Sequence, residues 1–204
     1  MQGLYLVTPN WNDTERLLAA TDAALTAGAA LVQYRHKDAS ASLRLEQATA
    51  LLALCRRHGC PLVINDHLDL CQAIDADGVH LGQSDRDIAI ARALLGRDKI
   101  VGASCYGDLT LARAARDAGA SYLAFGGFYP SPVKKYTFVT APELLGQARA
   151  EFALPLVVIG GMTPETAAPL GARGADMVAA ITSVYGAADP QTAAHAFGSL
   201  FSAG

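Results

Sequence analysis

The chain reads Leu156-Val-Val-Ile-Gly-Gly-Met-Thr-Pro164, a run that joins a candidate strand, a pair of glycines and a candidate helix start. Its apolar residues are continuous, which is typical of a strand buried on both faces in a parallel sheet covered by helices. Thr163 and Pro164 are residue types preferred at the N-cap and at the first position of a helix. The stretch therefore predicts one strand-to-helix unit of an α/β protein.

This unit recurs along the chain. Glycine follows the predicted helices at Gly28, Gly119 and Gly174, where it suits a left-handed C-cap, and Asn12 with Glu15 predicts a capping box at the first helix. The predicted strands are Leu4 to Thr8, Leu31 to Arg35, Leu62 to Asp66, Val79 to Gly82, Ile100 to Ser104, Tyr122 to Gly126, Leu156 to Gly161 and Met177 to Thr182.

Eight such units of about 25 residues each predict a minimal (β/α)8 TIM barrel, a single catalytic domain over residues 1–204. A doubly wound open sheet is the alternative, because local patterns do not show whether a sheet closes. Against it, no G-x-G-x-x-G follows the first strand.

Composition excludes several classes of protein. The net charge is -3, with 16 basic residues spread among 19 acidic ones, so no basic stripe suggests binding to nucleic acid. Cys55, Cys60, Cys71 and Cys105 form no C-x-x-C pair and are expected to be buried thiols. No secretory signal is seen, and no apolar run approaches the roughly 18 residues of a membrane span. We expect a soluble, cytoplasmic protein.

Barrel enzymes build their sites at the carboxyl ends of the strands. The second strand ends in Gln33, Arg35 and Lys37, and the spacing of two puts them on one face, away from Tyr34 and His36. Three polar or cationic side chains on one face predict a site for an anion or a polar ring. A solvated strand end is the alternative.

Two carboxylates follow neighbouring strands. Asp66 follows Asn65 at the end of the third strand, and Asp85 follows the fourth. Few, hard oxygen ligands are what Mg2+ prefers, so the pair predicts a metal site, although each aspartate could instead cap the next helix. His67 and His80 lack the three-ligand spacing of a zinc site.

A phosphate site is predicted after the last two strands. Gly161 precedes a capped helix, and Ile181 and Thr182 close the eighth strand, where barrels often bind phosphate through backbone N–H groups. Glycine for tight packing is the alternative. The longest irregular segment, Phe128 to about Val139, contains Lys134 and is expected to overhang the site, as a lid would.

Taken in order, these motifs resemble thiamine-phosphate synthase over nearly the whole chain. They are Gln33-x-Arg35-x-Lys37, Asn65-Asp66, His80-Leu81-Gly82-Gln83-x-Asp85, Gly102-x-Ser104, Pro130-Ser131-x-x-Lys134, Ile159-Gly160-Gly161-Met162 and Ala180-Ile181-Thr182. Each motif alone is weak, but seven in one order at barrel spacing are specific.

The resemblance implies that 4-amino-2-methyl-5-(diphosphooxymethyl)pyrimidine is joined to 4-methyl-5-(2-phosphooxyethyl)thiazole, or to its 2-carboxy form, with release of diphosphate. It implies one Mg2+ per active site, held by Asp66 and Asp85. By the same inference Gln33, Arg35, Lys37, Asn65, Ser104 and Lys134 would bind the pyrimidine diphosphate. Ser131, Pro132, Val133, Gly161, Ile181 and Thr182 would bind the thiazole phosphate.

The resemblance also implies a dissociative reaction through a pyrimidinylmethyl cation, with Arg35, Lys37, Ser104 and Lys134 as the catalytic residues. Positioning and leaving-group electrostatics would then be the protein's main tasks, and Cys105 and the histidines have no assigned role.

The chain departs from the family at two places. The family commonly has threonine at position 133, where this chain has Val133 beside Pro132, and serine is usual at position 182, where this chain keeps a hydroxyl in Thr182. The first departure bears on the predicted thiazole-phosphate contacts.

Two rival functions stay open. A related thiazole tautomerase would share the fold and the Ile159 to Met162 stretch but would not need the carboxylate pair. A non-catalytic binder of thiamine intermediates would not need two carboxylates beside a diphosphate site. The sequence also leaves open whether the chain forms a homo-oligomer.

Overall fold

The computed structural model describes residues 1–82, 85–130 and 137–201. Eight parallel strands close into a barrel in sequence order, and β1 pairs with β8 to complete the ring. The strands are β1 (Gly3–Val7), β2 (Leu31–Tyr34), β3 (Leu62–Asn65), β4 (Gly78–Leu81), β5 (Ile100–Tyr106), β6 (Tyr122–Gly126), β7 (Leu156–Ile159) and β8 (Met177–Ala180). The predicted TIM barrel is confirmed, and the open sheet is wrong.

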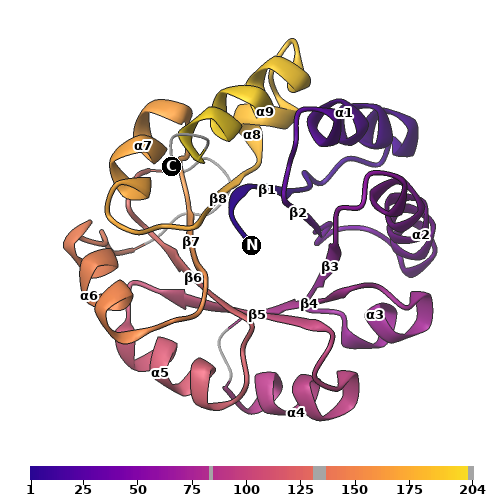
Figure 1. Ribbon diagram of the computed structural model, residues 1–204. Coiled ribbons are helices and arrows are strands. Elements are labelled where there is room, and N and C mark those ends of the chain that lie inside the picture. The colour runs from indigo at the N-terminus through magenta and orange to yellow at the C-terminus, as the bar shows by residue number, and fades with distance from the viewer. Residues whose placement is uncertain (83–84, 131–136, 202–204) are drawn as a thin grey trace.

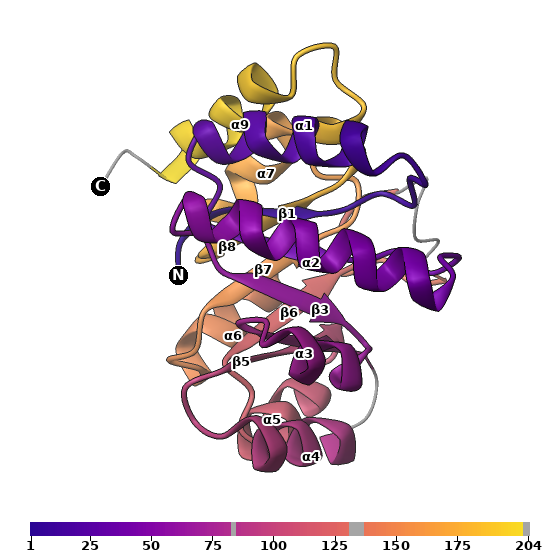
Figure 2. The same ribbon diagram turned by 90° about the vertical axis from the view of Figure 1, so that its right-hand side faces the viewer.

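Helices form an outer ring around the strands (Figure 1). They are α1 (Thr14–Thr26), α2 (Ala41–Arg57), α3 (Leu68–Ile74), α4 (Asp85–Leu95), α5 (Leu109–Asp117), α6 (Glu143–Glu151), α7 (Pro164–Gly171), α8 (Thr182–Tyr185) and α9 (Pro190–Gly198), followed by the 3-10 turn η1 (Ser199–Phe201). Figure 2 shows α1 and α2 lying side by side along one flank of the barrel. Among the described residues, no helix combines the length and apolar character that crossing a membrane requires.

The apolar residues form two layers. The larger layer lies between the strands and the helices and includes the four cysteines, all of them buried and reduced as expected. The smaller layer fills the inside of the barrel and comprises Tyr5, Val7, Leu31, Val63, Tyr122, Ala124, Val157, Met177 and Ala179. Burial on both sides explains why the strands have continuous apolar runs.

The helix ends are mostly as predicted. Thr163 caps α7 in a capping box with Thr166, and Gly28, Gly119 and Gly174 adopt φ values of 91°, 95° and 103°. At α1 the prediction is wrong by one residue, because the N-cap is Asp13, whose side chain accepts from the backbone N–H of Arg16. Aspartate accepts such a bond at least as well as the asparagine before it.

Side chains accept hydrogen bonds from backbone N–H groups at the amino ends of three strands, β3, β5 and β7. The Asp77 carboxylate accepts from the N–H of Leu62 at 2.8 Å, and the Asp176 carboxylate accepts from the N–H of Leu156 at 2.7 Å. At β5 the Ser121 hydroxyl accepts from the N–H of Val101 at 3.0 Å. These residues fix the lower rim of the barrel, opposite the end where the functional residues gather.

Candidate active site

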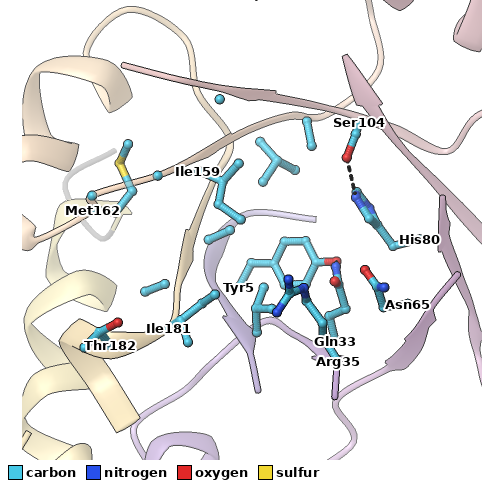
Figure 3. Close-up of a pocket in the computed structure, with 18 of the residues that line it drawn as sticks. Tyr5, Gln33, Arg35, Asn65, His80, Ser104, Ile159, Met162, Ile181 and Thr182 are labelled. Carbon is cyan, nitrogen blue, oxygen red and sulfur yellow. Dashed lines mark hydrogen bonds between the residues drawn. The ribbon is translucent and has the colours of Figure 1, made fainter. Parts of the chain in front are cut away.

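A cavity of about 820 Å³ opens at the carboxyl ends of the strands. All eight strands, or the loops directly after them, contribute to its wall, and Figure 3 shows ten of the lining residues by name. Its size is typical of a small-molecule site, and its position is where TIM barrels carry out their chemistry.

Nine of the predicted site residues line this cavity. They are Gln33, Arg35, Lys37, Asn65, Asp66, Ser104, Gly161, Ile181 and Thr182. Four others, Ser131, Pro132, Val133 and Lys134, lie outside the described residues, as do residues 131–136 of the predicted lid as a whole. Asp85 is the first residue of α4, directly after the loop that follows β4, and its side chain also lies outside the described part.

Alternation along β2 decides which side chains face the cavity. Three alternate residues of the Gln33 to Lys37 segment line it, as predicted. The residues between them face α2, where the Tyr34 hydroxyl donates to Gln47 Oε1 at 3.0 Å and His36 Nδ1 lies 3.3 Å from the same oxygen. The contacts of Tyr34 and His36 with α2 thus keep Gln33, Arg35 and Lys37 directed toward the cavity.

Arg35 is positioned by the end of β1. The Thr8 hydroxyl accepts from the backbone N–H of Arg35 at 2.8 Å and donates to its carbonyl at 3.1 Å. Burial lowers the pKa of the Arg35 guanidinium, whereas the negative charges of Asp66 and Asp38 raise it. Since arginine stays protonated through such shifts, the cavity wall carries a partly desolvated positive charge. Thr8 was not predicted, and its only signal is a polar residue directly after a buried strand.

Asn65 and Asp66 form the neighbouring part of the wall. Asp66 has φ of 61°, its N–H donates to the His80 carbonyl at 2.9 Å, and Asn65 Nδ2 donates to its carboxylate at 2.7 Å. The N-cap of α3 is His67, which makes no side-chain cap bond, so the helix-capping alternative for Asp66 is wrong. Asp66 instead takes an uncommon backbone conformation at the cavity.

Gly161 shows why glycine is needed after β7. Its φ is 64°, and a Cβ there would lie 2.3 Å from the carbonyl oxygen of Pro130. The carbonyl of Gly161 accepts from the Thr166 hydroxyl at 3.1 Å, which ties the loop to the first turn of α7. Gly161 is therefore tightly packed against Pro130 and also lines the cavity, so the two interpretations of this glycine are compatible.

Below the cationic wall runs a chain of polar side chains that the sequence did not predict. Gln33 Nε2 donates to the Tyr5 hydroxyl, which lies 2.6 Å from the Tyr122 hydroxyl. The Tyr122 hydroxyl lies 2.7 Å from His80 Nδ1, and His80 Nε2 lies 2.9 Å from Ser104 Oγ, the contact drawn dashed in Figure 3. We call these five residues the polar chain. The only sequence signal is a tyrosine in an otherwise apolar strand, since a buried phenol needs a partner.

No group of three or more His, Cys, Asp or Glu that could hold a metal is found in residues 1–82, 85–130 and 137–201. Because the side chain of Asp85 lies outside this part, the predicted Asp66 and Asp85 pair stays a prediction.

The chain is similar to known proteins over nearly its whole length. It is 60% identical over 201 residues to thiamine-phosphate synthase of Janthinobacterium sp. (strain Marseille), which covers 98% of this chain and 97% of the relative. It is 50% identical over 196 residues to thiamine-phosphate synthase of Xanthomonas campestris pv. campestris (strain 8004), covering 96% and 94%.

Solved structures agree. Thiamine phosphate pyrophosphorylase from Pyrococcus furiosus superposes with a TM-score of 0.85 at 30% identity, covering 98% of this chain and 95% of that one. A 3-hexulose-6-phosphate synthase, with a TM-score of 0.73 at 20% identity, is similar in fold alone. The model of the thiamine monophosphate synthase family matches residues 4–184. On this evidence the chain belongs to the thiamine monophosphate synthase family, and it is an enzyme of the transferase class.

Proposed function

We propose that this protein is a Mg2+-dependent thiamine-phosphate synthase. Its substrates are 4-amino-2-methyl-5-(diphosphooxymethyl)pyrimidine and 4-methyl-5-(2-phosphooxyethyl)thiazole or its 2-carboxy form. Its products are thiamine phosphate and diphosphate, together with carbon dioxide when the 2-carboxy form reacts. The main support is one observation. One cavity at the carboxyl end of the barrel is lined by the polar residues that the resemblance implied in strands β2, β3 and β5 and directly after β2 and β3.

The reaction breaks the bond between the pyrimidine methylene carbon and the diphosphate oxygen, and the electron pair leaves with diphosphate. The aminopyrimidine stabilises the resulting cation. The thiazole nitrogen then donates its lone pair to the methylene carbon, which forms the C–N bond of the product. No side chain acts as a nucleophile, so the protein supplies positioning and charge.

Arg35 and Lys37 are the described cations suited to the leaving diphosphate. Both line the cavity in the segment directly after β2, and Arg35 is partly desolvated, which strengthens its attraction to a growing negative charge. Lys134 would add a third positive charge from the loop after β6. Asn65 and Ser104 contribute neutral hydrogen-bonding groups to the same wall.

The available donors fit Mg2+. Asp66 brings a hard carboxylate to the cavity wall, and Asp85 follows the adjacent strand, so two carboxylates and the substrate phosphates would leave room for water. When bound, the metal would supply further positive charge for the leaving group. The phosphate of the thiazole partner would bind on the opposite side of the cavity, at Gly161, Ile181 and Thr182 with Ser131 to Val133.

Incubation of the purified protein with both substrates and Mg2+ tests this function. We expect thiamine phosphate and diphosphate in equal amounts, and none after chelation of the metal. Isomerisation of a thiazole phosphate without diphosphate release would indicate the tautomerase instead. Binding of the substrates without any turnover would indicate the non-catalytic binder.

A further inference from the structure

The hydrogen bonds of the polar chain depend on one another. The direction of each bond, from donor to acceptor, determines the direction of the next bond in the chain. An amide NH2 only donates, so the Tyr5 hydroxyl accepts from Gln33 and has its single proton left for Tyr122. Tyr122 accepts that proton and therefore donates its own to His80 Nδ1. The imidazole proton is then on Nε2, where it faces Ser104 Oγ.

The two ends of the polar chain lie in the cavity wall. With this direction the Ser104 hydroxyl accepts from His80 and keeps its own proton for a ligand. At the other end the Gln33 amide nitrogen donates to the Tyr5 hydroxyl. The amide oxygen of Gln33 is then the group that can accept a hydrogen bond from a ligand in the cavity. The site thus shows an acceptor at Gln33 and a donor at Ser104.

Turning the Gln33 amide over would reverse every bond in the chain. The Gln33 amide oxygen would accept from the Tyr5 hydroxyl, and the imidazole proton of His80 would be on Nδ1. The Ser104 hydroxyl would then donate its proton to His80 Nε2. The cavity would then show a donor at Gln33 and no donor at Ser104. Because both phenols are buried and burial raises the pKa of each, neither can resolve a mismatch by losing its proton. The two ends are therefore coupled.

We propose that Tyr5, Tyr122 and His80 determine specificity for an amino-substituted heterocycle over its oxo counterpart. This inference rests on the proposed function. A 4-aminopyrimidine offers an amino donor beside a ring-nitrogen acceptor, which matches the acceptor at Gln33 and the donor at Ser104. A 4-oxopyrimidine offers a carbonyl acceptor beside a ring N–H donor, so each contact is reversed. The two tyrosines and the histidine act through Gln33 and Ser104 and are positioning residues.

Packing holds the chain in place. Tyr5 and Tyr122 make an edge-to-face contact at 5.8 Å between ring centroids, and His80 stacks on Tyr122 at 5.6 Å. A Cβ on Gly102 would lie 2.1 Å from Cζ of Tyr122, so the ring occupies space that this glycine leaves. A phenylalanine at position 5 or 122 would keep these ring contacts and remove only the hydroxyl.

The test compares kcat/KM for the 4-amino and 4-oxo pyrimidine diphosphates in the wild type, Tyr5→Phe and Tyr122→Phe. We expect the amino-to-oxo ratio to fall by about tenfold to a hundredfold in both variants, since removing either hydroxyl uncouples the two ends. Tyr34→Phe is the matched control, because it also removes a buried hydroxyl, from the opposite face of β2, and should leave the ratio unchanged.

Nitrogen-15 NMR of the imidazoles gives a second measurement that does not depend on turnover. His80 is expected to show a proton on Nε2 in the wild type, with His80→Asn identifying its signals among the five histidines. A proton on Nδ1, or an unchanged ratio in folded Tyr5→Phe and Tyr122→Phe, would overturn the proposal. Absence of any thiamine phosphate despite an Nε2 proton would instead contradict the proposed function.

Discussion

At the scale of the residue, the metal assignment is tested at Asp66. Asparagine tolerates the positive φ of this position, so Asp66→Asn should keep the fold while removing the charge. We expect turnover to fall on the order of 10²-fold, with a higher Mg2+ concentration needed for half-maximal rate. Steady-state kinetics over a Mg2+ titration is the measurement. Asp69→Asn, an exposed change of the same kind in the first turn of α3, is the control. Equal rates for the two variants would remove Asp66 from the metal site.

The side to which a side chain points was predictable where side chains alternate along an extended segment. The spacing of two from Gln33 to Lys37 predicts that these side chains share one face of an extended segment, and in the structure all three line the cavity. The polar chain was not predictable. A continuous apolar run does not show which residues face the barrel interior, so Tyr5 and Tyr122 look like ordinary core residues, and His80 gains its role only through them.

At the scale of the element, the loop between β7 and α7 depends on Gly161. Gly161→Ala adds a Cβ at 2.3 Å from the Pro130 carbonyl oxygen and strains a positive φ. We expect a loss of about 1–3 kcal/mol in stability and a higher KM for the thiazole phosphate. Gly146→Ala is the matched control, since α6 has open space there and alanine should stabilise the helix by roughly 0.5–1 kcal/mol. Urea unfolding measures the stability of both variants, and steady-state kinetics measures KM for the thiazole phosphate. Equal stabilities and equal KM values in the two variants would contradict the prediction.

The amino ends of the strands should affect stability without affecting catalysis. In Asp176→Ala the partly buried N–H of Leu156 loses its acceptor and Arg149 loses its ion-pair partner, which should cost about 1–3 kcal/mol. Asp117→Ala breaks an exposed ion pair with Arg116, which solvent screens, and should leave stability almost unchanged. Urea unfolding of both variants measures the difference, and kcat should match the wild type in each. A large fall in kcat for Asp176→Ala would contradict this, because it would mean that a change at the amino ends of the strands alters the active site.

The elements themselves were predictable, because eight apolar runs with helix signals between them leave few other folds. Their ends were less so. The structure ends most strands one or two residues earlier than predicted, at the point where the chain leaves the ladder to form the cavity wall. At α1 two capping residue types stand next to each other, and only the geometry selects Asp13 over Asn12.

At the scale of the whole molecule, buried thiols make stability depend on alkaline pH. Burial raises the pKa of Cys71 to about 11 and those of Cys60 and Cys105 to about 12, from 9.0 for a free thiol. The folded state therefore keeps protons that the unfolded chain loses. This contribution is fully present below about pH 9 and is lost as pH rises through 11 to 12. The thermal midpoint, measured under reducing conditions, should fall between pH 8.5 and about 10.5, and less steeply in Cys71→Ala. A flat profile would contradict this.

Closure of the barrel was beyond local patterns, because each run predicts a strand but not its neighbour. The pairing of Gly3 with Met177 and of Leu4 with Val178 joins the two ends of the sequence. The number of strand-helix units and the absence of G-x-G-x-x-G after the first strand favoured a closed sheet, and the resemblance carried by the seven motifs supported it.

That pairing has a consequence during synthesis on the ribosome. Strand β1 leaves the exit tunnel first but keeps one unpaired edge until β8 has emerged, some 170 residues later. Throughout translation the nascent chain therefore exposes a strand edge that other chains can pair with. A polypeptide that ends before Met177 would lack the partner of β1, so the synthesis of β8 decides between a closed barrel and aggregation.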